Sequence, residues 1–494
     1  MPGKSDSLLV GLSMGTTKIS MIVAEKDNRY PDSVHIIGFG NAPSNGISKG
    51  IIVSHQDARQ SVEEAFAEAQ SITGIQAKRL SNVIVAFNAD GIESKTSHGM
   101  VTLGDRDSRS VKPNDIDRAI DRARRDLALR SSMYPLHMIP TSYELDGRPV
   151  DEPLNMNGNQ LDLWLQTVSV PMTHIQNVIN CVRAAGLEIR GLLLKPLAAS
   201  LGALYEEEMR SGCISINIGG GTTGIVLYRG GRAFRVISIP IGGDHIKNDL
   251  ATLMRISLAD AEHLKKRIFT TPEEKLIQEG IDVDFAYEII TARIEELFGK
   301  QVRSALAECT PQSFPNGIIL SGGVSEMPGI NDVLQNIMQM PVRKVVEPIY
   351  KMPRGLDTPA YVSSAGILKY FVSTERDPYL FMESDQPLPG LSNRSEMRER
   401  QEQRSQERRE RERNAEINND LDDEDYFDDE PEDKPEPERQ RGGFWSKRKA
   451  NNNNNNNDDD EGEYEDDTPQ NDDNPRRTFG QIAKKIAELF KEAF

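Results

Sequence analysis

The sequence has few of the features that mark secreted, metal-binding or membrane-spanning chains. Its 494 residues include three cysteines, Cys181, Cys213 and Cys309, too scattered for a metal or disulfide pattern, and they fit a reducing cytosol. No apolar run approaches the roughly 20 residues of a membrane-spanning helix. The apolar run near residue 10 is too short for a signal peptide. The formal net charge of −18 disfavours nonspecific nucleic-acid binding.

The negative charge is concentrated in one segment. Residues 384–477 carry 16 Lys and Arg against 30 Asp and Glu, a balance of −14, whereas residues 1–383 come to −5. The segment is of low complexity and cannot bury enough apolar surface to fold, so we expect a disordered acidic linker of about 95 residues. Within it, Phe444 and Trp445 stand beside basic residues and suit a contact with lipid or a partner, or no contact at all.

The last 17 residues, 478–494, change to an amphipathic pattern. Apolar residues share one face and lysines lie on the other: Phe479, Ile482, Ile486, Leu489, Phe490 and Phe494 against Lys484 and Lys485. A helix of this length is about 25 Å long. It is too polar to cross a bilayer but suits the interface of an anionic membrane. A groove on a partner protein or the chain's own core are the alternatives, and the long linker argues against the core.

Residues 8–383 have the pattern of an α/β fold with mixed sheets. Short apolar runs, such as residues 82–87, alternate with helical patterns, such as residues 55–74. A further helix is predicted from residue 172, with a capping box at Thr173 and Gln176.

Three glycine-rich turns in this part are candidates for a phosphate site. "CISINIGGGTTGIVLYRGG", residues 213–231, is typical of strand, tight turn and strand. We call residues 15–17 the first turn, residues 219–222 the second turn and residues 322–323 the third turn. Glycines let backbone amides face a phosphate closely, and threonine hydroxyls add donors. One such turn alone is usually an ordinary hairpin, but the three in this order indicate two α/β lobes that face each other.

With these turns the chain resembles the actin, Hsp70 and sugar-kinase superfamily, and within it the FtsA family of bacterial cell-division proteins. The resemblance covers nearly all of residues 8–383, through segments such as "IPIGGDHIKNDLA", "LSGGVSEMPGI" and "YVSSAGIL". It implies an actin-like two-lobed ATPase fold with an FtsA-type extra subdomain. The implied subdomains are 1A (8–83 and 168–198), the inserted SHS2-like 1C (84–167), 2A (199–243 and 319–383) and 2B (244–318).

The resemblance also implies that the site binds ATP or ADP. Phosphate contacts would fall on Gly15, Thr16, Thr17 and Lys18, and on Gly220, Gly221, Thr222 and Thr223. The other implied contacts are Gly242 and Gly243, Glu262 and Lys265, and Gly322, Gly323 and Met327. Glu262 and Lys265 lie one helical turn apart and would reach the ribose and base; the alternative is an ion pair on the surface of the helix.

Two positions depart from the family's pattern. Ser13 and Asn217 stand where the family usually has aspartates that hold the water shell of a metal ion. We therefore expect Mg²⁺ to be held weakly and by no direct protein ligand. The nucleotide is then a structural ligand that is hydrolysed poorly or not at all, and no catalytic residue is assigned.

The resemblance supplies the partners. The C-terminal tail of FtsZ is expected on residues 244–318, where the pattern of residues 286–306 predicts a helix with Arg293, Lys300 and Arg303 outward. Basic side chains suit a peptide with acidic groups. Arg293 also suits an ion pair with Glu295 or Glu296 on its own helix.

Family members also form head-to-tail filaments and meet later division proteins. The expected function is to tether FtsZ filaments to the inner face of the cytoplasmic membrane at the division site. Many terminal helices on one filament would bind lipid together by avidity. There are three alternative functions. An ATP-dependent enzyme such as a sugar kinase needs a carboxylate base, and a chaperone needs a substrate domain after residue 383. A pilus-type actin-like adaptor lacks the terminal helix.

Overall fold

The computed structural model describes residues 8–27, 30, 33–104, 108–307, 309, 311–377 and 380–382. The predicted acidic linker and the amphipathic pattern at residues 478–494 lie outside these residues. In the described part, the prediction of an α/β fold with mixed sheets is confirmed. No helix in that part has the length and apolar character needed to cross a membrane.

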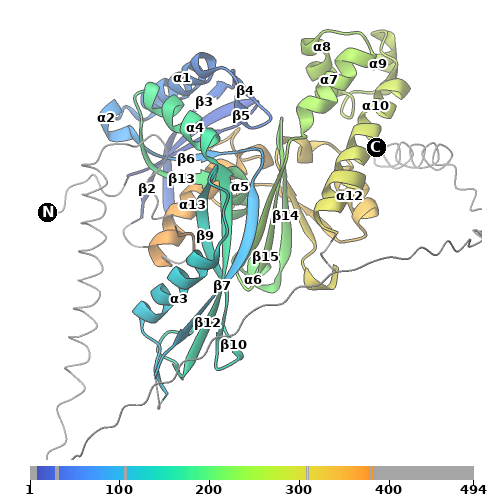
Figure 1. Ribbon diagram of the computed structural model, residues 1–494. Helices are drawn as coiled ribbons and strands as arrows, with labels where there is room; N and C mark the ends of the chain where they lie inside the picture. Colours follow the sequence, from blue (N-terminus) through green and yellow to red (C-terminus); the bar gives the residue numbers. More distant parts are fainter. Residues whose placement is uncertain are drawn as a thin grey trace, which may run out of the picture. The chain divides into compact units, whose positions relative to one another are not determined.

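The first sheet has five strands in the order β13-β6-β1-β2-β3. Figure 1 labels four of them, β2, β3, β6 and β13. β1 pairs antiparallel with β2 and parallel with β6, so the sheet is mixed. The apolar runs predicted as strands form its centre, because residues buried on both faces of a sheet read as continuous apolar runs. The strands are β1 (Leu8–Met14), β2 (Lys18–Lys26), β3 (Val34–Pro43), β6 (Asn82–Phe87) and β13 (Glu188–Leu194).

Helices cover both faces of the first sheet. α1 (His55–Thr73) packs on one face, where its backbone at Ala65 lies against Gly40 of β3, and α4 (Met172–Ala184) lies beside it. α5 (Lys195–Ala203) and α13 (Val362–Arg376) pack on the other face, where Ile367 meets Gly11 of β1.

The second sheet also has five strands, in the order β16-β15-β14-β17-β18. β14 pairs antiparallel with β15 through the second turn and parallel with β17. The strand, turn and strand predicted for residues 213–231 are therefore confirmed. The strands are β14 (Cys213–Ile218), β15 (Thr223–Arg229), β16 (Arg232–Ile239), β17 (Ile318–Ser321) and β18 (Val342–Lys344).

The alternating isoleucines of β14 explain how this sheet packs. Ile214, Ile216 and Ile218 are fully buried and belong to one apolar cluster with the helices that follow β16. The helices of this cluster are α7 (Gly243–Leu253), α8 (Leu258–Arg267), α9 (Glu273–Gln278), α10 (Val283–Glu295), a π-helical segment (Glu296–Val302), α11 (Arg303–Ala305) and α12 (Ile330–Met338). The opposite face of the sheet contacts α5, where the Tyr228 and Ser200 hydroxyls share a hydrogen bond of 2.8 Å.

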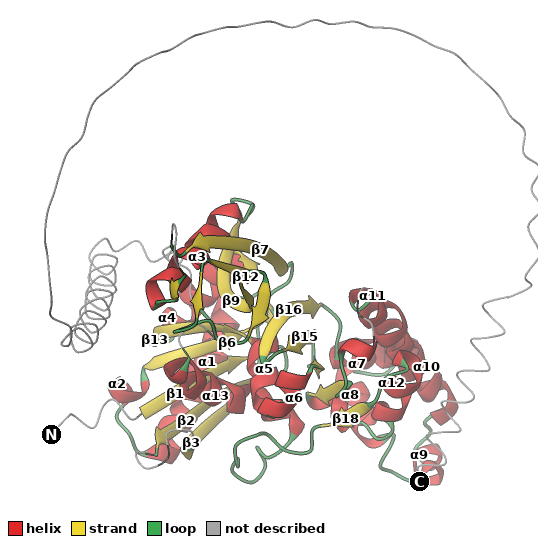
Figure 2. Cartoon of the chain, turned by 90° about the horizontal axis from the view of Figure 1, so that it is seen from below, coloured by secondary structure: helices red, strands yellow, loops and turns green. Residues whose placement is uncertain are grey.

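The crossing of α5 and α13 is unusually close. A Cβ on Gly202 would lie 1.9 Å from the carbonyl oxygen of Val362, and one on Gly366 would lie 1.6 Å from that of Ala198. Backbone therefore meets backbone at the crossing. Because α5 contacts strands of both five-stranded sheets, this crossing lies between them (Figure 2).

The residues between β6 and β13 include a separate four-stranded antiparallel sheet, ordered β10-β9-β12-β7. α3 (Pro113–Asp126) lies along this sheet (Figure 1), and its buried residues form a cluster with the sheet that is distinct from the other two apolar cores. The strands of this region are β7 (Glu93–Thr102), β8 (Arg109–Ser110), β9 (Met133–Leu145), β10 (Arg148–Val150), β11 (Asn157–Gly158) and β12 (Gln160–Pro171).

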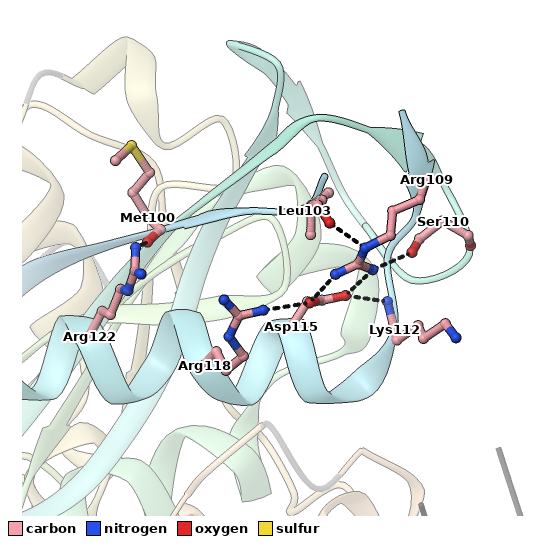
Figure 3. Close-up of polar contacts among 8 residues, drawn as sticks. All are labelled: Met100, Leu103, Arg109, Ser110, Lys112, Asp115, Arg118 and Arg122. Carbon is pink, nitrogen blue, oxygen red and sulfur yellow. Dashed lines mark hydrogen bonds and ion pairs between the residues drawn. The ribbon is translucent and has the colours of Figure 1, made fainter. Parts of the chain in front are cut away.

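Asp115 organises the start of α3 (Figure 3). The Arg109 guanidinium donates to both of its oxygens at 2.7 Å, and the backbone amide of Lys112 donates at 3.0 Å. Burial alone would raise the pKa of Asp115, but these hydrogen bonds and the charges of Arg109 and Arg118 hold that pKa below its ordinary value of 3.8. Asp115 thus caps the helix and ties it to β8.

Several short elements complete the fold. β4 (Ile47–Ser48) and β5 (Ile51–Ile52) form a small hairpin, and the Lys49 and Gly50 turn between them lies beside the second turn. The others are α2 (Ala77–Leu80), α6 (Glu206–Ser211) and three 3-10 helices (Pro311–Ser313, Gly323–Glu326 and Pro359–Tyr361).

One expectation about a helix start differs from the structure. The capping box at Thr173 is wrong, because β12 ends at Pro171 and α4 begins at Met172, so Thr173 is already inside the first turn. α13 belongs to the implied subdomain 2A; in the structure it packs on β1, β2 and α5, in an apolar cluster that includes residues of both five-stranded sheets.

We expect Gly366→Ala to destabilise the protein by about 3 kcal/mol or more, since the new methyl group would collide with backbone rather than with a movable side chain. Gly299→Ala is the matched control, because a Cβ there meets nothing within 4 Å. Thermal unfolding measures both. Equal melting temperatures for the two variants would contradict the close crossing.

We expect Asp115→Asn to cost about 2 kcal/mol at pH 7, by loss of charged hydrogen bonds. The pKa of Asp115 is lowered in the folded chain, so its contribution is present above about pH 3.8 and is lost as pH falls through the folded pKa. The difference in melting temperature between wild type and variant should shrink below that pH. Asp121→Asn on the same helix, where the side chain is exposed, should show a small difference at every pH.

Candidate functional site

The first and second turns are in direct contact. A Cβ on Gly220 would lie 2.2 Å from Cγ2 of Thr17, and a Cβ on Gly221 would lie 2.6 Å from Oγ1 of Thr16. Only glycine permits this approach, which explains the glycine run of the second turn. The turns converge, as their order in the sequence predicted.

The second turn directs its carbonyl groups toward α7. Gly219 and Gly220 accept hydrogen bonds from the amides of Gly243 and Asp244, at 2.9 and 2.7 Å. Gly242 must be glycine, because its Cβ would lie 2.5 Å from both of those carbonyl oxygens. The amides of Gly220 and Gly221 have no partner among the described residues, which leaves two donors for an anion.

The third turn is bound to the end of β14. Gly322 has a φ of 93°, and its Cβ would lie 2.4 Å from the carbonyl oxygen of Ile218. Asn217 donates from Nδ2 to Oγ of Ser321 at 3.0 Å, so this amide links β14 to the third turn. Gly323 faces open space, with nothing within 4 Å of its Cβ position.

Met327 is mostly inside the protein. Only 8% of its surface is exposed, and its side chain belongs to the apolar cluster of the second sheet and its helices. It follows the 3-10 helix that begins at Gly323, so a short 3-10 turn carries the chain back into the core. At most one edge of Met327 is open to a ligand.

Glu262 and Lys265 of α8 are placed in a way that is compatible with both an ion pair and a contact with a nucleotide. Lys265 donates to Glu262 at 2.6 Å, which is the ion pair that helical spacing allows. Lys265 also reaches the carbonyl oxygen of Gly243 at 3.4 Å. The pair therefore lies against the Gly242–Gly243 segment instead of standing free on the surface.

Two lysines lie in this part of the site, Lys18 and Lys195, and the sequence pointed only to Lys18. The Lys18 ammonium lies 3.1 Å from the centroid of the Tyr361 ring. Lys195 is the first residue of α5, and its Nζ lies 2.5 Å from the position that a Cβ of Gly15 would take. A lysine followed by proline at a helix start was visible in the sequence, but nothing local showed where its side chain points.

The pKa values of both lysines are lower than that of a free lysine. Desolvation, followed by the charge of Lys195, lowers the pKa of Lys18 to about 7, and the charge of Glu326 opposes this. Desolvation lowers the pKa of Lys195 to about 8. A bound anion would reverse both shifts, because it favours the charged ammonium.

Asn88 and Gly50 also belong to the site and were missed. Asn88, at the end of β6, donates to Oγ1 of Thr222 at 2.7 Å and accepts from Oγ of Ser238 at 3.0 Å. The amide of Gly50 donates to Oγ1 of Thr16 at 3.3 Å. Lys49 beside it has a φ of 48°, a conformation that non-glycine residues seldom adopt. These contacts hold the first and second turns in register.

One expected phosphate contact is corrected. Thr223 is fully buried, and its hydroxyl donates to the carbonyl oxygen of Ile241 at 2.8 Å. It is the first residue of β15, and the alternation of the strand turns its side chain away from the turn. Thr16 and Thr17 are not buried, so their hydroxyls are accessible from the surface of the site.

The predicted helix over residues 286–306 is present as α10, the π-helical segment and α11, with its predicted apolar face buried. Arg293, expected outward, instead forms a two-pronged ion pair with Asp249 of α7 at 2.6 and 2.9 Å. It also contacts Glu296, the pair that its spacing allowed. Arg303 is exposed but donates to the carbonyl oxygen of Ile337, and Lys300 is exposed.

The arrangement suits the phosphates of a nucleotide better than it suits a metal ion. Backbone amides, threonine hydroxyls and the ammonium group of Lys195 meet at the first and second turns, and Lys18 follows the first turn with its ammonium over the Tyr361 ring. In the positions nearest to them along β1 and β14, Ser13 is buried and Asn217 is occupied with Ser321. Neither of these side chains is a carboxylate, the group by which proteins usually hold Mg²⁺.

Comparison with known proteins gives consistent matches. The family model described as "Cell division protein FtsA" matches residues 214–366, and the model "SHS2 domain inserted in FTSA" matches residues 89–169. The chain is 30% identical to the cell division protein FtsA of Pseudomonas aeruginosa, over 76% of this chain and 91% of that protein. It is 29% identical to the Bacillus subtilis protein of the same name, over 74% and 84%.

Among solved structures, the chain is similar to a chain of the PilM-PilN type IV pilus biogenesis complex. The TM-score is 0.53 at 18% identity, over 74% of this chain and 98% of that chain. At this identity the similarity concerns the fold alone.

We expect Asn88→Ala to destabilise the protein by about 2–3 kcal/mol, because it removes hydrogen bonds of a buried amide and leaves Thr222 and Ser238 unpaired. Asn82→Ala, at the exposed start of the same strand, should be near neutral. Thermal unfolding of both variants tests this. A loss in Asn82→Ala as large as that in Asn88→Ala would speak against the role assigned to Asn88.

Proposed function

The chain belongs to the FtsA family of cell division proteins, which has an actin-like fold with an inserted SHS2 domain, and from this we propose that it binds ATP, assembles into filaments and tethers FtsZ filaments to the membrane. The proposal that the chain binds a nucleotide rests on the contact between the first and second turns. Free amides, threonine hydroxyls and the Lys195 ammonium meet there, with Lys18 next to the first turn in the chain, and a polyphosphate needs donors of these kinds.

The proposed nucleotide lies with its phosphates between the first and second turns and its nucleoside toward α8 and the third turn. The open position at Gly323 and the Glu262–Lys265 pair beside Gly243 support this direction. Hydrolysis is proposed to be weak or absent. Ser13 and Asn217 supply no carboxylate that could orient water or act as a general base.

The tail of FtsZ is proposed to bind the helices of residues 244–318. Lys300 is the strongest candidate contact, since its side chain is exposed. Arg293 would have to exchange its ion pair with Asp249 for a carboxylate of the peptide, which offsets most of the gain. Arg303 is exposed and closer to Lys300 along the helix, so these two form the more accessible basic pair.

Membrane attachment is proposed through residues 478–494. Their support is the sequence pattern alone: an aromatic apolar face with lysines opposite. The acidic linker before them repels an anionic membrane and holds the folded part away from it. A filament that carries many such helices binds lipid far more strongly than one helix does, because each later contact is intramolecular.

Two rival functions are weaker. A sugar kinase needs a carboxylate base beside the terminal phosphate, where this chain has Ser13 and Asn217. A pilus-type adaptor draws support from the fold similarity to the PilM-PilN complex. A pilus-type adaptor has no need of an amphipathic segment such as residues 478–494. A test of membrane binding therefore distinguishes such an adaptor from the proposed membrane tether.

We expect full-length protein to carry a fluorescent FtsZ tail peptide into the pellet with vesicles that contain anionic lipid, and protein that lacks residues 478–494 to leave it in the supernatant. Phe490→Glu, on the apolar face, should reduce sedimentation at least about tenfold, the loss of one buried aromatic contact with lipid. Gln481→Glu adds the same charge on the polar face and should reduce it far less. Equal sedimentation of the truncated and full-length proteins would exclude this tether.

A further inference from the structure

We propose that this site binds nucleotide phosphates without a divalent cation, and that the ammonium group of Lys195 supplies the positive charge that Mg²⁺ would otherwise supply. The inference rests on the proposed nucleotide binding and concerns how the charge of the phosphates is neutralised. It differs from the expectation of weak Mg²⁺ binding, because it assigns the role of the ion to a residue of the chain.

The position of Lys195 carries the proposal. Its side chain extends from the first residue of α5 to the first turn, where Nζ lies 2.5 Å from the position of a Cβ on Gly15. A side chain on residue 15 would therefore displace this ammonium. Lys195 has no hydrogen-bond or ion-pair partner among the described residues, and burial is the cause that lowers its pKa, so its charge is available to a ligand.

The place of Lys195 is also fixed by packing. The next residue, Pro196, lies within 2.7 Å of the position that a Cβ on Gly224 would take, so the start of α5 is held against β15 directly behind the second turn. The crossing at Gly202 and Gly366 holds the rest of the helix. A cation on such a rigid element is preorganised and needs little reorganisation when an anion arrives.

The residues around this ammonium suit an anion and not a second cation. Lys18 is the residue after the first turn, its ammonium lies over the Tyr361 ring, and the charge of Lys195 helps to lower its pKa. A Mg²⁺ ion at the first turn would be repelled by the ammonium of Lys195 and also by that of Lys18. A triphosphate has enough negative charge to bind both lysines together.

The carboxylates nearby are poorly suited to a metal ion. Asp244 borders the second turn through Oδ2, which lies 3.0 Å from the position of a Cβ on Gly220, while Lys247 donates to Oδ1 at 2.9 Å and offsets the charge. Glu326 is exposed and acts on Lys18. In the described ranges, no three side chains of His, Cys, Asp or Glu gather into a metal-binding group. Mg²⁺ favours one or two free carboxylates in addition to phosphate oxygens, so the donor set does not fit it.

The experiment is isothermal titration of full-length protein with ATP, once with excess Mg²⁺ and once with EDTA. We expect the wild-type Kd to differ by less than about threefold between the two conditions. Lys195→Met should weaken binding in EDTA at least about tenfold, which is about 1.4 kcal/mol, and Lys195→Arg should retain most of the affinity. Lys369→Met is the matched control, since Lys369 is a mostly buried lysine of α13 whose ammonium pairs with Glu206 of α6.

Proton uptake on ATP binding is a second measurement. It would not change in a Lys195 variant if the role of Lys195 were purely structural. Lys195, Lys18, Glu326 and Tyr361 are titratable groups of this part of the site, and Asp244 borders the second turn. At pH 8.5 the two lysines are mostly neutral without ligand, so ATP binding should take up protons. Titrations in two buffers of different ionisation enthalpy measure that uptake. It should be smaller in Lys195→Met than in wild type.

The outcomes distinguish this inference from the proposed function. Wild-type protein that binds ATP only with Mg²⁺ would overturn the inference and leave nucleotide binding intact. No binding in either condition would overturn both. If Lys195→Met changed neither the affinity for ATP nor the proton uptake, the role assigned to Lys195 would be wrong. If that variant does not fold, absence of proton uptake by the wild type at pH 8.5 would overturn the inference.

Discussion

The close crossing of α5 and α13 is the constraint on which the site depends. Ala198 and Gly202 of α5 meet Val362 and Gly366 of α13 with backbone against backbone, so neither helix can slide without a collision. Because α5 touches both five-stranded sheets, the crossing fixes how those sheets meet. It also fixes the start of α5, and with it the ammonium of Lys195 at the first turn. Helix packing thus decides the electrostatics of a site at the end of the helix.

The site combines an open backbone cradle with an excess of positive charge. The second turn commits its carbonyl groups to α7 and leaves two amides free, while Thr16 and the two lysines add further donors. The folded part of the chain otherwise has a slightly negative balance, and most of the negative charge lies in residues 384–477. Charge is therefore segregated along the chain: cationic where phosphates are proposed to bind, acidic in the segment that precedes the proposed membrane contact.

Local sequence was sufficient for much of the fold. Apolar runs predicted the central strands, helical periodicity predicted α1 and the buried face of α10, and glycine runs predicted the turns, since each depends on contacts within a few residues. The capping box at Thr173 failed because Pro171 ends one strand and starts the helix directly. The outward position of Arg293 failed because periodicity identifies a helix face but not what packs against it, and Asp249 lies 44 residues away.

By itself, the sequence determined that the chain is an α/β protein of the FtsA type, that two glycine–threonine turns form a candidate phosphate site, and that carboxylates are missing at Ser13 and Asn217. Only the tertiary structure decided which side chains complete the site. Asn88 reaches Thr222 across 134 residues of chain, and Lys195 reaches the first turn from another helix. The reason is physical: the direction of a side chain depends on the packing of distant elements, and no short stretch of sequence contains that information.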